Sequence, residues 1–370
     1  MNITVLRDNL REGLGAMERA VAQENTLPIL KNVLLVTEGN KIRVTATNLE
    51  IGITKYILGK IQKEGGITVP FQTLFTIVNN CDAEKIYLET QGGTLLFKTD
   101  NYEAKLQGAA KEDFPIIPTI EHKDTSITLD AGVLKGAILE IMSASQISDI
   151  RPEISGILFD FQLSLFKLVA TDSFRLGEKI LTHTQFTTNA TKGFKVIIPF
   201  KTIQEIIRIF KDDRELTLFI DAHQILIEDS DTKLISRLVD GSYPDYEQII
   251  PKTTETELSV PKQQFMNAVK LVSTFSGKVH DIKLRLKEGA KALEIYSATQ
   301  QMGENKYLIP VNAKGSEFEE LVFNWRYLID GLKPIHAEHF SFGINGDAKP
   351  AVLRAGEDAS YLYVVMPIKQ

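Results

Sequence analysis

Leu168-Val-Ala-Thr-Asp-Ser-Phe-Arg-Leu-Gly177 is an apolar run that ends in a short polar turn, and a similar stretch occurs twice more in the chain. Val44-Thr-Ala-Thr-Asn-Leu-Glu-Ile-Gly52 precedes it, and Ile295-Tyr-Ser-Ala-Thr-Gln-Gln-Met-Gly303 follows it. The Ala-Thr pairs start at positions 46, 170 and 298, so the copies lie 124 and 128 residues apart. A fixed period predicts repeated structural units. Because the middle copy carries Phe174 and Arg175, we expect the working surface there.

Composition limits the class of protein. The chain has 370 residues, 43% of them apolar and 24% charged, which suits a globular protein of two or three domains. We expect no secretory signal and no membrane span. The single Cys81 fits a reducing, cytoplasmic setting. The net charge of −6 argues against tight nucleic-acid binding through bulk charge, although it leaves room for local basic faces.

Each copy is predicted to begin with an amphipathic helix, because apolar residues recur at spacings of three and four. The predicted apolar faces are Leu6, Leu10, Leu14, Met17 and Val21 in the first copy, Leu134, Ala137, Ile138, Ile141 and Met142 in the second, and Phe265, Ala268, Val269 and Val272 in the third. In the second copy, Asp130 is placed to cap the helix.

Strand hairpins should follow each first helix, over 32–38 with 41–47, 155–161 with 165–171, and 281–286 with 292–298. A second helix is predicted after Pro70, Pro199 and Phe323, with both prolines in the first helical turn. Its inward residues are expected to be Leu74, Phe75 and Val78, then Ile203, Ile207 and Phe210, then Leu328, Ile329 and Leu332. Strands close each copy, and 114–118 and 246–251 are the predicted linkers.

Four motifs in order carry a resemblance to a known family. They are Thr26-Leu-Pro-Ile-Leu30, Ala170-Thr-Asp with Arg175-Leu176, Leu238-Val-Asp-Gly-Ser-Tyr-Pro-Asp-Tyr246 and Tyr363-Val-Val-Met-Pro367. With these, the chain resembles end to end the bacterial DNA polymerase III beta subunit family, the replicative sliding clamps. The resemblance implies an α+β fold of three DNA-clamp domains, each with two helices packed on antiparallel sheets. We place the domains at 1–120, 121–252 and 253–370.

The resemblance also implies a ring of two chains joined head to tail, with six domains around double-stranded DNA. Such a ring binds DNA independently of its base sequence. It tethers the replicative polymerase, binds a clamp loader and other clamp-binding peptides, and catalyses no reaction. Geometry supports the dimer. With helices about 8–10 Å apart, six of them leave a hole of roughly 7 Å, whereas twelve leave about 24 Å. A duplex of about 20 Å passes only the larger hole.

Helix cations off the apolar faces are predicted to line that hole, since sliding needs weak phosphate contacts. The alternative is that these are ordinary solvated surface charges. The predicted DNA-binding residues are Arg7, Arg11, Arg19, Lys135, Lys201, Arg208, Lys211, Lys262, Lys270, Arg326 and Lys333, together with Arg151, which resembles a DNA-touching loop of the family. Glu24 stands where some relatives have an arginine, which puts that contact in question.

The resemblance places a partner-peptide pocket between the second and third domains. Aliphatic walls with an adaptable Met366 suit a buried peptide, and Arg175 could hold a carboxylate or carbonyl. The alternative is an ordinary core at a domain junction. Ser173, Phe174 and Gln248 depart from some clamps, so the peptide preference stays open. The pocket residues are Ile154, Thr171, Ser173, Phe174, Arg175, Leu176, Pro244, Gln248, Ile249, Asn324, Tyr327, Val364, Val365, Met366, Pro367 and Ile368.

Other interpretations are weaker. Leu106 and Phe275 are predicted at the dimer edge, although both could belong to the core. No Walker-type or dinucleotide glycine motif occurs. His336 and His339 lack a third ligand, so we expect no metal and no cofactor, and Asp172 should stabilise its turn. The remaining alternative is a three-repeat peptide-binding scaffold that never encircles DNA.

Overall fold

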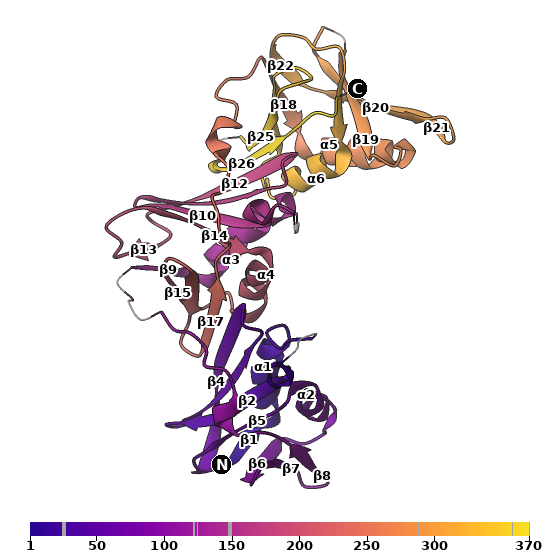
Figure 1. The fold of residues 1–370 in the computed structure, drawn as a ribbon. Coiled ribbons are helices and arrows are strands. Elements are labelled where there is room, and N and C mark those ends of the chain that lie inside the picture. The colour runs from indigo at the N-terminus through magenta and orange to yellow at the C-terminus, as the bar shows by residue number, and fades with distance from the viewer. Residues whose placement is uncertain are drawn as a thin grey trace. The chain divides into compact units, whose positions relative to one another are not determined.

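The computed structural model describes residues 1–23, 27–120, 123, 125–146, 150–287, 289–356 and 358–369. It divides into two compact units, whose helices and strands are labelled in Figure 1. The first comprises Met1–Gly132, Thr187–Ala190 and Lys201–Leu238. The second comprises Val133–Phe186, Thr191–Phe200 and Val239–Gln370.

Six segments of the described chain share one order, in which a short strand leads into a helix and three strands follow. The first two are β1(Asn2–Leu6), α1(Arg7–Met17), β2(Asn32–Glu38), β3(Lys41–Thr47), β4(Ile51–Lys63), and β5(Gly66–Pro70), α2(Phe71–Asn80), β6(Lys85–Gln91), β7(Thr94–Lys98), β8(Glu103–Gln107). The middle two are β9(Ser126–Asp130), α3(Ala131–Ile141), β10(Gly156–Gln162), β11(Leu165–Thr171), β12(Arg175–Thr182), and β14(Phe194–Pro199), α4(Phe200–Ile209), β15(Glu215–Ile220), β16(Gln224–Glu228), β17(Thr232–Arg237). The last two are β18(Thr256–Pro261), α5(Lys262–Val272), β19(Asp281–Lys287), β20(Ala292–Thr299), β21(Gly303–Pro310), and β23(Leu321–Asn324), α6(Trp325–Leu332), β24(His339–Ile344), β25(Ala351–Ala355), β26(Asp358–Val365).

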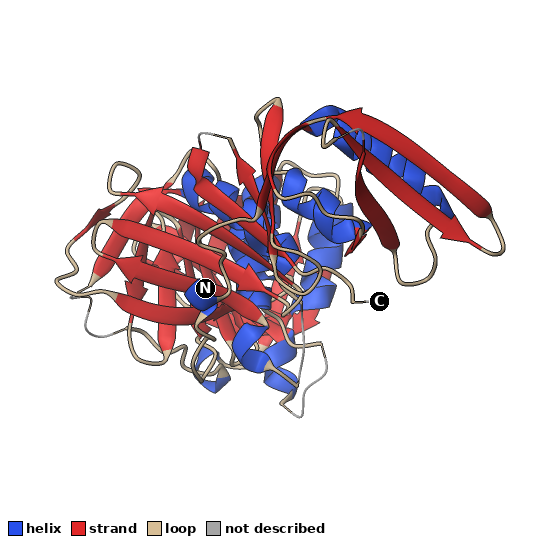
Figure 2. Ribbon diagram, turned by 90° about the horizontal axis from the view of Figure 1, so that it is seen from above, coloured by secondary structure: helices blue, strands red, loops and turns tan. Residues whose placement is uncertain are grey.

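Two short strands, β13(Thr187–Thr188) and β22(Asn312–Gly315), and six 3₁₀ turns complete the described elements. The turns are η1(Pro28–Lys31), η2(Lys111–Asp113), η3(Met142–Ala144), η4(Pro152–Ile154), η5(Tyr246–Gln248) and η6(Ser273–Phe275). Strands predominate and the helices are short in the chain as drawn (Figure 2). The predicted α+β repeat is therefore confirmed, and each copy consists of two such segments.

Each helix begins at the residue directly after its leading strand ends. Pro70, Pro199 and Pro261 occupy three of these junctions. Proline suits the last extended position, because its φ is fixed and the missing N–H is not needed there. The prediction that Pro70 and Pro199 lie inside the first helical turn is thus wrong by one residue.

In the first unit the strands form one antiparallel sheet of 13 strands, whose main path is β13-β9-β15-β16-β17-β4-β1-β6-β7-β8. The second unit holds a nine-stranded sheet, β14-β10-β11-β12-β26-β25-β24-β18-β22, and a four-stranded sheet, β21-β20-β19-β23. The middle repeat is consequently divided. Its β9 and β15 to β17 join the sheet of the first repeat through β4, whereas its β10 to β12 and β14 join that of the third through β26.

Most of the predicted helix faces are buried, which confirms the 3.6-residue period. The exceptions lie at helix ends or on flanks. Leu6 is exposed at the start of α1, and Val21, Phe75, Met142 and Ile207 are only partly buried. Phe75 stacks on Phe71 with ring centroids 5.1 Å apart. In α4, Ile206 takes the fully buried place expected for Ile207.

Each of the two predicted linkers contains one buried aromatic residue among exposed and partly buried ones. Phe114 and Tyr246 are 5% and 2% exposed, respectively. Tyr246 belongs to an apolar cluster with Leu158, Val169 and Leu176. Each linker therefore contributes side chains to the unit in which it lies.

The first two repeated turns have the same hydrogen bonds. Thr47 Oγ1 accepts from Leu49 N–H and donates to the Ile51 carbonyl, and Thr171 Oγ1 does the same with Ser173 and Arg175. Leu49 and Ser173 both have positive φ, 74° and 78°. The third turn is shorter, since Thr299 pairs with Gly303 whereas Thr171 pairs with Leu176, five residues on. Gly303 supplies the positive φ there.

Candidate partner-binding and DNA-binding residues

The turn after β11 and the end of β26 form one hydrogen-bonded element of the second unit. Arg175 and Leu176 pair with Val365 and Val364 in the β12–β26 ladder, and β12 lies beside β26 in Figure 1. Beyond the ladder, Met366 N–H donates to the Phe174 carbonyl at 2.8 Å. The C-terminal segment is therefore fixed against the turn that the repeat analysis singled out.

Arg175 is held from three sides. Its Nε donates to Asp172 Oδ2 and its Nη1 to Asp330 Oδ2, both at 2.8 Å. Its guanidinium lies 4.2 Å from the Tyr327 ring centroid. Burial alone would lower the pKa of Arg175, but Tyr363 and the two carboxylates raise it above its usual value. Its Nε and Nη1 are therefore engaged within the chain, and its role in holding a partner carboxylate stays a prediction.

Asp172 stabilises the turn, as predicted. Its Oδ1 accepts from the backbone N–H groups of Phe174 and Arg175, at 2.9 and 3.0 Å. Phe174 itself is 60% exposed. This turn therefore leaves a large apolar side chain accessible to solvent.

The other predicted pocket residues divide by burial. Ile154, Thr171, Leu176, Val364, Val365 and Pro367 are buried, and Leu176 and Val364 belong to the apolar cluster around Tyr246. Arg175, Pro244, Asn324, Tyr327, Met366 and Ile368 are partly buried, and Ser173, Gln248 and Ile249 are exposed. The accessible part of the predicted site is formed by the exposed and partly buried residues. The buried ones act as their support.

The segment after Met366 continues along the third repeat. Ile368 N–H donates to the Val322 carbonyl at 2.7 Å, next to β23 and α6. Asn324 caps α6 by accepting from Arg326 N–H at 3.0 Å. Asn324 and Tyr327 are thereby placed on the element that also carries Asp330, the second carboxylate on Arg175. Sequence reasoning missed Asp330 and Tyr363, because neither lies in the repeated turn.

The helix cations divide into exposed and engaged groups. Arg11, Lys201, Lys270 and Arg326 are exposed and make no ion pair within the described chain. Arg19 and Arg208 face Glu205, Lys211 faces Glu12, and Lys333 faces Asp330. Lys262 donates to backbone carbonyls, Arg7 donates to the Cys81 carbonyl, and Lys135 is partly buried.

Arg208 has a structural role that the sequence did not indicate. Its Nη atoms donate to the carbonyls of Gly15 and Ala16, at 2.6 and 2.8 Å. Those carbonyls lie at the C-terminal end of α1, where a positive charge is favourable. Most of the Arg208 donors are used in this way, so it is a poor source of phosphate contacts.

The α-helices of the described chain carry a surplus of positive charge, although the whole chain has a net charge of −6. Their acidic residues are Asp8, Glu12, Glu140, Glu205 and Asp330. Their basic residues are Arg7, Arg11, Lys135, Lys201, Arg208, Lys262, Lys270 and Arg326. The α-helices therefore carry a small net positive charge, chiefly because they contain fewer acidic residues than the rest of the chain.

Arg151, in the predicted DNA loop, donates to Ser173 Oγ at 2.8 Å and also faces Glu153. Glu24 lies outside the described residues. His336 and His339 are exposed, and the described part of the chain contains no cluster of three or more potential metal ligands. No helix among the described residues is long and apolar enough to cross a bilayer.

Comparison with known proteins identifies the family. The family models for the N-terminal, central and C-terminal domains of the DNA polymerase III beta subunit match residues 1–118, 128–245 and 247–369. The beta sliding clamp of Chlamydia pneumoniae is 27% identical, over 100% of this chain and 99% of its own. The DNA polymerase III subunit beta of Pseudomonas aeruginosa superposes with a TM-score of 0.92 at 27% identity, with 100% of both chains covered.

These matches extend over nearly the whole chain, in the order of the three repeats. The fold and the repeated turns define a clamp protein built from three similar domains. The chain belongs to the DNA polymerase III beta subunit family, and its function is that of a polymerase sliding clamp.

Proposed function

We propose that two copies of the chain join head to tail into a ring around double-stranded DNA, without regard to base sequence. The observation that carries this proposal is the surplus of positive charge on the α-helices of an acidic chain. Sequence-independent binding rests on phosphate contacts, which need basic residues but no tight fit. A closed ring adds topological retention, so weak contacts are sufficient.

The ring would close through exposed sheet edges. The strand β8 ends the large sheet of the first unit, and β21 ends the four-stranded sheet of the second. Leu106 lies on β8 but is 5% exposed, so the β8 backbone rather than this side chain would pair. Phe275 is partly buried beside Gly303 at the start of β21. Two different edges give a head-to-tail contact that a twofold rotation can close into a ring.

Within the ring, Arg11, Lys201, Lys270 and Arg326 are the proposed DNA contacts, together with Arg151, which directly precedes η4. These helix cations are exposed and carry no ion pair in the described residues. Arg7, Arg19, Lys135, Lys211, Lys262 and Lys333 would add to the positive field rather than bind phosphate directly, because each is partly buried or has a protein partner or both.

The partner-peptide site is proposed around Phe174, Ile249, Tyr327, Met366 and Ile368. Exposed and partly buried apolar side chains beside a hydrogen-bonded C-terminal segment suit a short peptide with apolar anchors. Its occupants would be the replicative polymerase, the clamp loader and other replication and repair proteins. We further propose that the clamp is cytoplasmic, performs no reaction itself, and has domains at 1–120, 121–252 and 253–370.

The test is retention on DNA of different topology. A ring loaded on nicked circular plasmid should stay bound at high salt and be released when a restriction enzyme linearises the plasmid. Equal retention on both forms would reject encirclement and favour an open scaffold. The solution mass should be twice 41.4 kDa. A monomer at micromolar concentration would contradict the ring.

A further inference from the structure

Two successive repeats pair with each other once in each unit, through β4 and β17 in the first and through β12 and β26 in the second. Equivalent residues of the repeat lie at these two junctions. In the first unit, Thr45 pairs with Leu34 and Thr54, and Gly52 pairs with Ile235. In the second, Val169 pairs with Leu158 and Glu178, and Leu176 pairs with Val364. One further residue belongs to each set: Leu226 pairs with Ile235 in the first unit, and Val352 pairs with Val364 in the second.

The two sets differ in how they are filled. In the second unit, Val169, Leu176 and Leu362 close an apolar cluster. The equivalent positions in the first unit are Thr45, Gly52 and Lys233. Lys233 corresponds to Leu362 because it pairs with Thr54, whereas Leu362 pairs with Glu178, the equivalent of Thr54. Three aliphatic side chains are thus replaced by a hydroxyl, a hydrogen and a cation. Less volume fills this junction, and part of what remains is polar.

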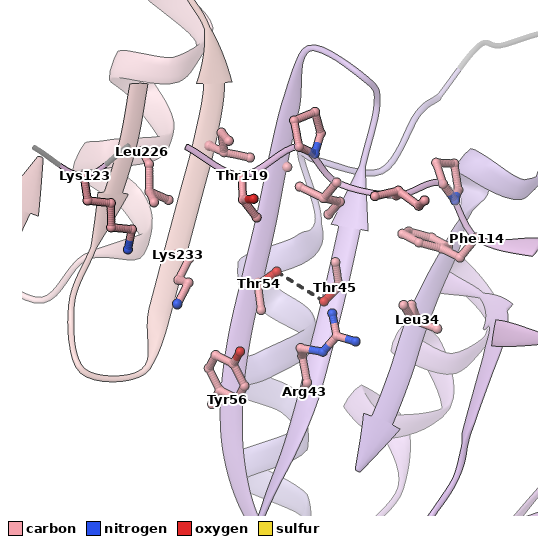
Figure 3. Close-up of a pocket in the computed structure, with 16 residues that line it drawn as sticks. Leu34, Arg43, Thr45, Thr54, Tyr56, Phe114, Thr119, Lys123, Leu226 and Lys233 are labelled. Carbon is pink, nitrogen blue, oxygen red and sulfur yellow. Dashed lines mark hydrogen bonds between the residues drawn. The ribbon is translucent and has the colours of Figure 1, made fainter. Parts of the chain in front are cut away.

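A cavity of about 410 Å³ lies at this position (Figure 3). That volume falls in the range of small-ligand and side-chain pockets. Leu34, Phe114, Ile117, Leu226 and Ile235 supply apolar walls. Thr45 and Thr54 are joined by a hydrogen bond of 3.2 Å between their hydroxyls. The segment 114–119 runs along the cavity, with Ile116 95% exposed.

The charged residues that line the cavity are Arg43, Lys123 and Lys233, and none of its described lining residues is acidic. Two carboxylates just outside the lining face these three cations. Glu38 pairs with Arg43 at 2.9 Å, and Glu228 is shared by Lys123 at 2.9 Å and Lys233 at 3.3 Å. Among the described residues, three cations therefore face two carboxylates at the rim, and Lys233 remains 44% exposed.

We propose that this cavity is a second peptide-docking site of the clamp, and that it takes an acidic peptide with one apolar anchor. The anchor would enter between Phe114, Leu226 and Ile235, and carboxylates would approach Lys233 and Lys123 at the rim. An extended strand places residues i and i+2 on one side, about 7 Å apart. Acidic residues two positions from the anchor thus face the rim when the anchor enters the cavity.

The probe for the test is acetyl-Glu-Gly-(4-fluoro-Phe)-Gly-Glu-amide, with a Gln-for-Glu peptide as its neutral counterpart. Binding to the full-length chain is followed by broadening of the ¹⁹F resonance. Lys233→Glu should weaken binding by about fivefold, as should replacing the peptide carboxylates, and binding should fall with rising salt. Thr54→Phe should abolish binding by filling the cavity. If Thr54→Phe does not fold, Lys233→Glu carries the test.

A matched control is Lys60→Glu, a charge reversal at an exposed position of β4 away from the cavity lining. It should leave probe binding unchanged. Equal affinity for the neutral peptide, no effect of Lys233→Glu, or no broadening at all would overturn the proposal. Loss of probe binding on deletion of 366–370 would place the probe at the C-terminal site and overturn it as well. None of these outcomes bears on encirclement, which the plasmid experiment tests separately.

Discussion

Met366 N–H donates a 2.8 Å hydrogen bond to the carbonyl of Phe174, joining the end of the chain to the turn of its middle repeat. This bond continues the β12–β26 ladder by one position beyond Arg175 and Val365. The C-terminal residues are therefore held by a turn that Thr171 and Asp172 stabilise through their own hydrogen bonds. The apolar side chains of Phe174 and Met366 are consequently presented from the same element.

Deletion of residues 366–370 should abolish binding of a polymerase-derived peptide without changing the solution mass. The deletion removes the hydrogen bonds to Phe174 and Val322 together with the Met366 side chain, whereas Val365 keeps its place in the sheet. Met366→Ala, which keeps the backbone bonds, should weaken binding by about tenfold. Fluorescence anisotropy with a labelled peptide measures both, and undiminished binding would show that the site is wrongly assigned.

Arg175→Met should lower the free energy of unfolding by about 3 kcal/mol, because it leaves two carboxylates without their shared cation. Asp172 is only 2% exposed and cannot regain its hydration. Urea denaturation followed by tryptophan fluorescence measures the change, since Trp325 lies on α6 with Asp330. Arg326→Met, an exposed position on the same helix, should change stability by less than about 0.5 kcal/mol. Equal effects of the two substitutions would contradict the ion-pair argument.

Glu12 should contribute to stability at neutral pH and lose that contribution in acid. A hydrogen bond from Lys211 at 2.7 Å, with a smaller effect of Lys55, lowers the pKa of Glu12 below its usual 4.5. A carboxyl with a lowered folded pKa stabilises above its unfolded pKa and loses the effect as the pH falls through the folded one. Glu12→Gln should therefore destabilise at neutral pH and converge with the unchanged chain well below 4.5.

The check is urea unfolding across that pH range, with Glu64→Gln as the control. Glu64 is exposed and has no ion pair in the described chain. Its substitution should produce no pH-dependent difference. A Glu12→Gln difference that grows in acid would have the wrong sign for this account.

Simultaneous replacement of Arg11, Lys201, Lys270 and Arg326 by Ala should weaken equilibrium binding to short linear DNA, which a ring can leave at either end, and flatten its salt dependence. The slope of log affinity against log salt should fall by about 0.9 for each phosphate that the clamp no longer neutralises. The matched control removes four exposed cations that lie outside the α-helices: Lys31, Lys60, Lys63 and Lys85. An equally large effect in the control would show that net charge, not helix position, governs binding.

Much of the fold was predictable because it follows from local periodicity. The spacing of Leu10, Leu14 and Met17 predicted a helix face, and Asp172 was predicted to stabilise its turn, since both effects depend on neighbouring residues. The division of the middle repeat between two sheets was not predictable, because it depends on the pairing of β17 with β4 and of β12 with β26 across long stretches of sequence.

The candidate site was predictable only in part. The family resemblance suggested Phe174 and Met366, which stay predictions as partner contacts. Nothing local to Arg175 indicated that Asp330 would hold it from another helix. The engagement of Arg208 by α1 was likewise invisible, because it joins residues of the first and second repeats. The sequence shows which residues are cationic. Whether a cation is free to bind DNA or a partner depends on residues that are distant in the sequence.

The divided middle repeat has a practical consequence for dissecting the molecule. In a fragment cut at the repeat boundaries, β12 and β17 would become unpaired edge strands, because β26 and β4, with which they now pair, would be missing. Unpaired edge strands form hydrogen bonds with the edge strands of other molecules, so these fragments would aggregate. Truncation experiments meant to isolate the central third of the chain should expect filaments or insoluble material, and neighbouring strands would have to be kept to avoid them.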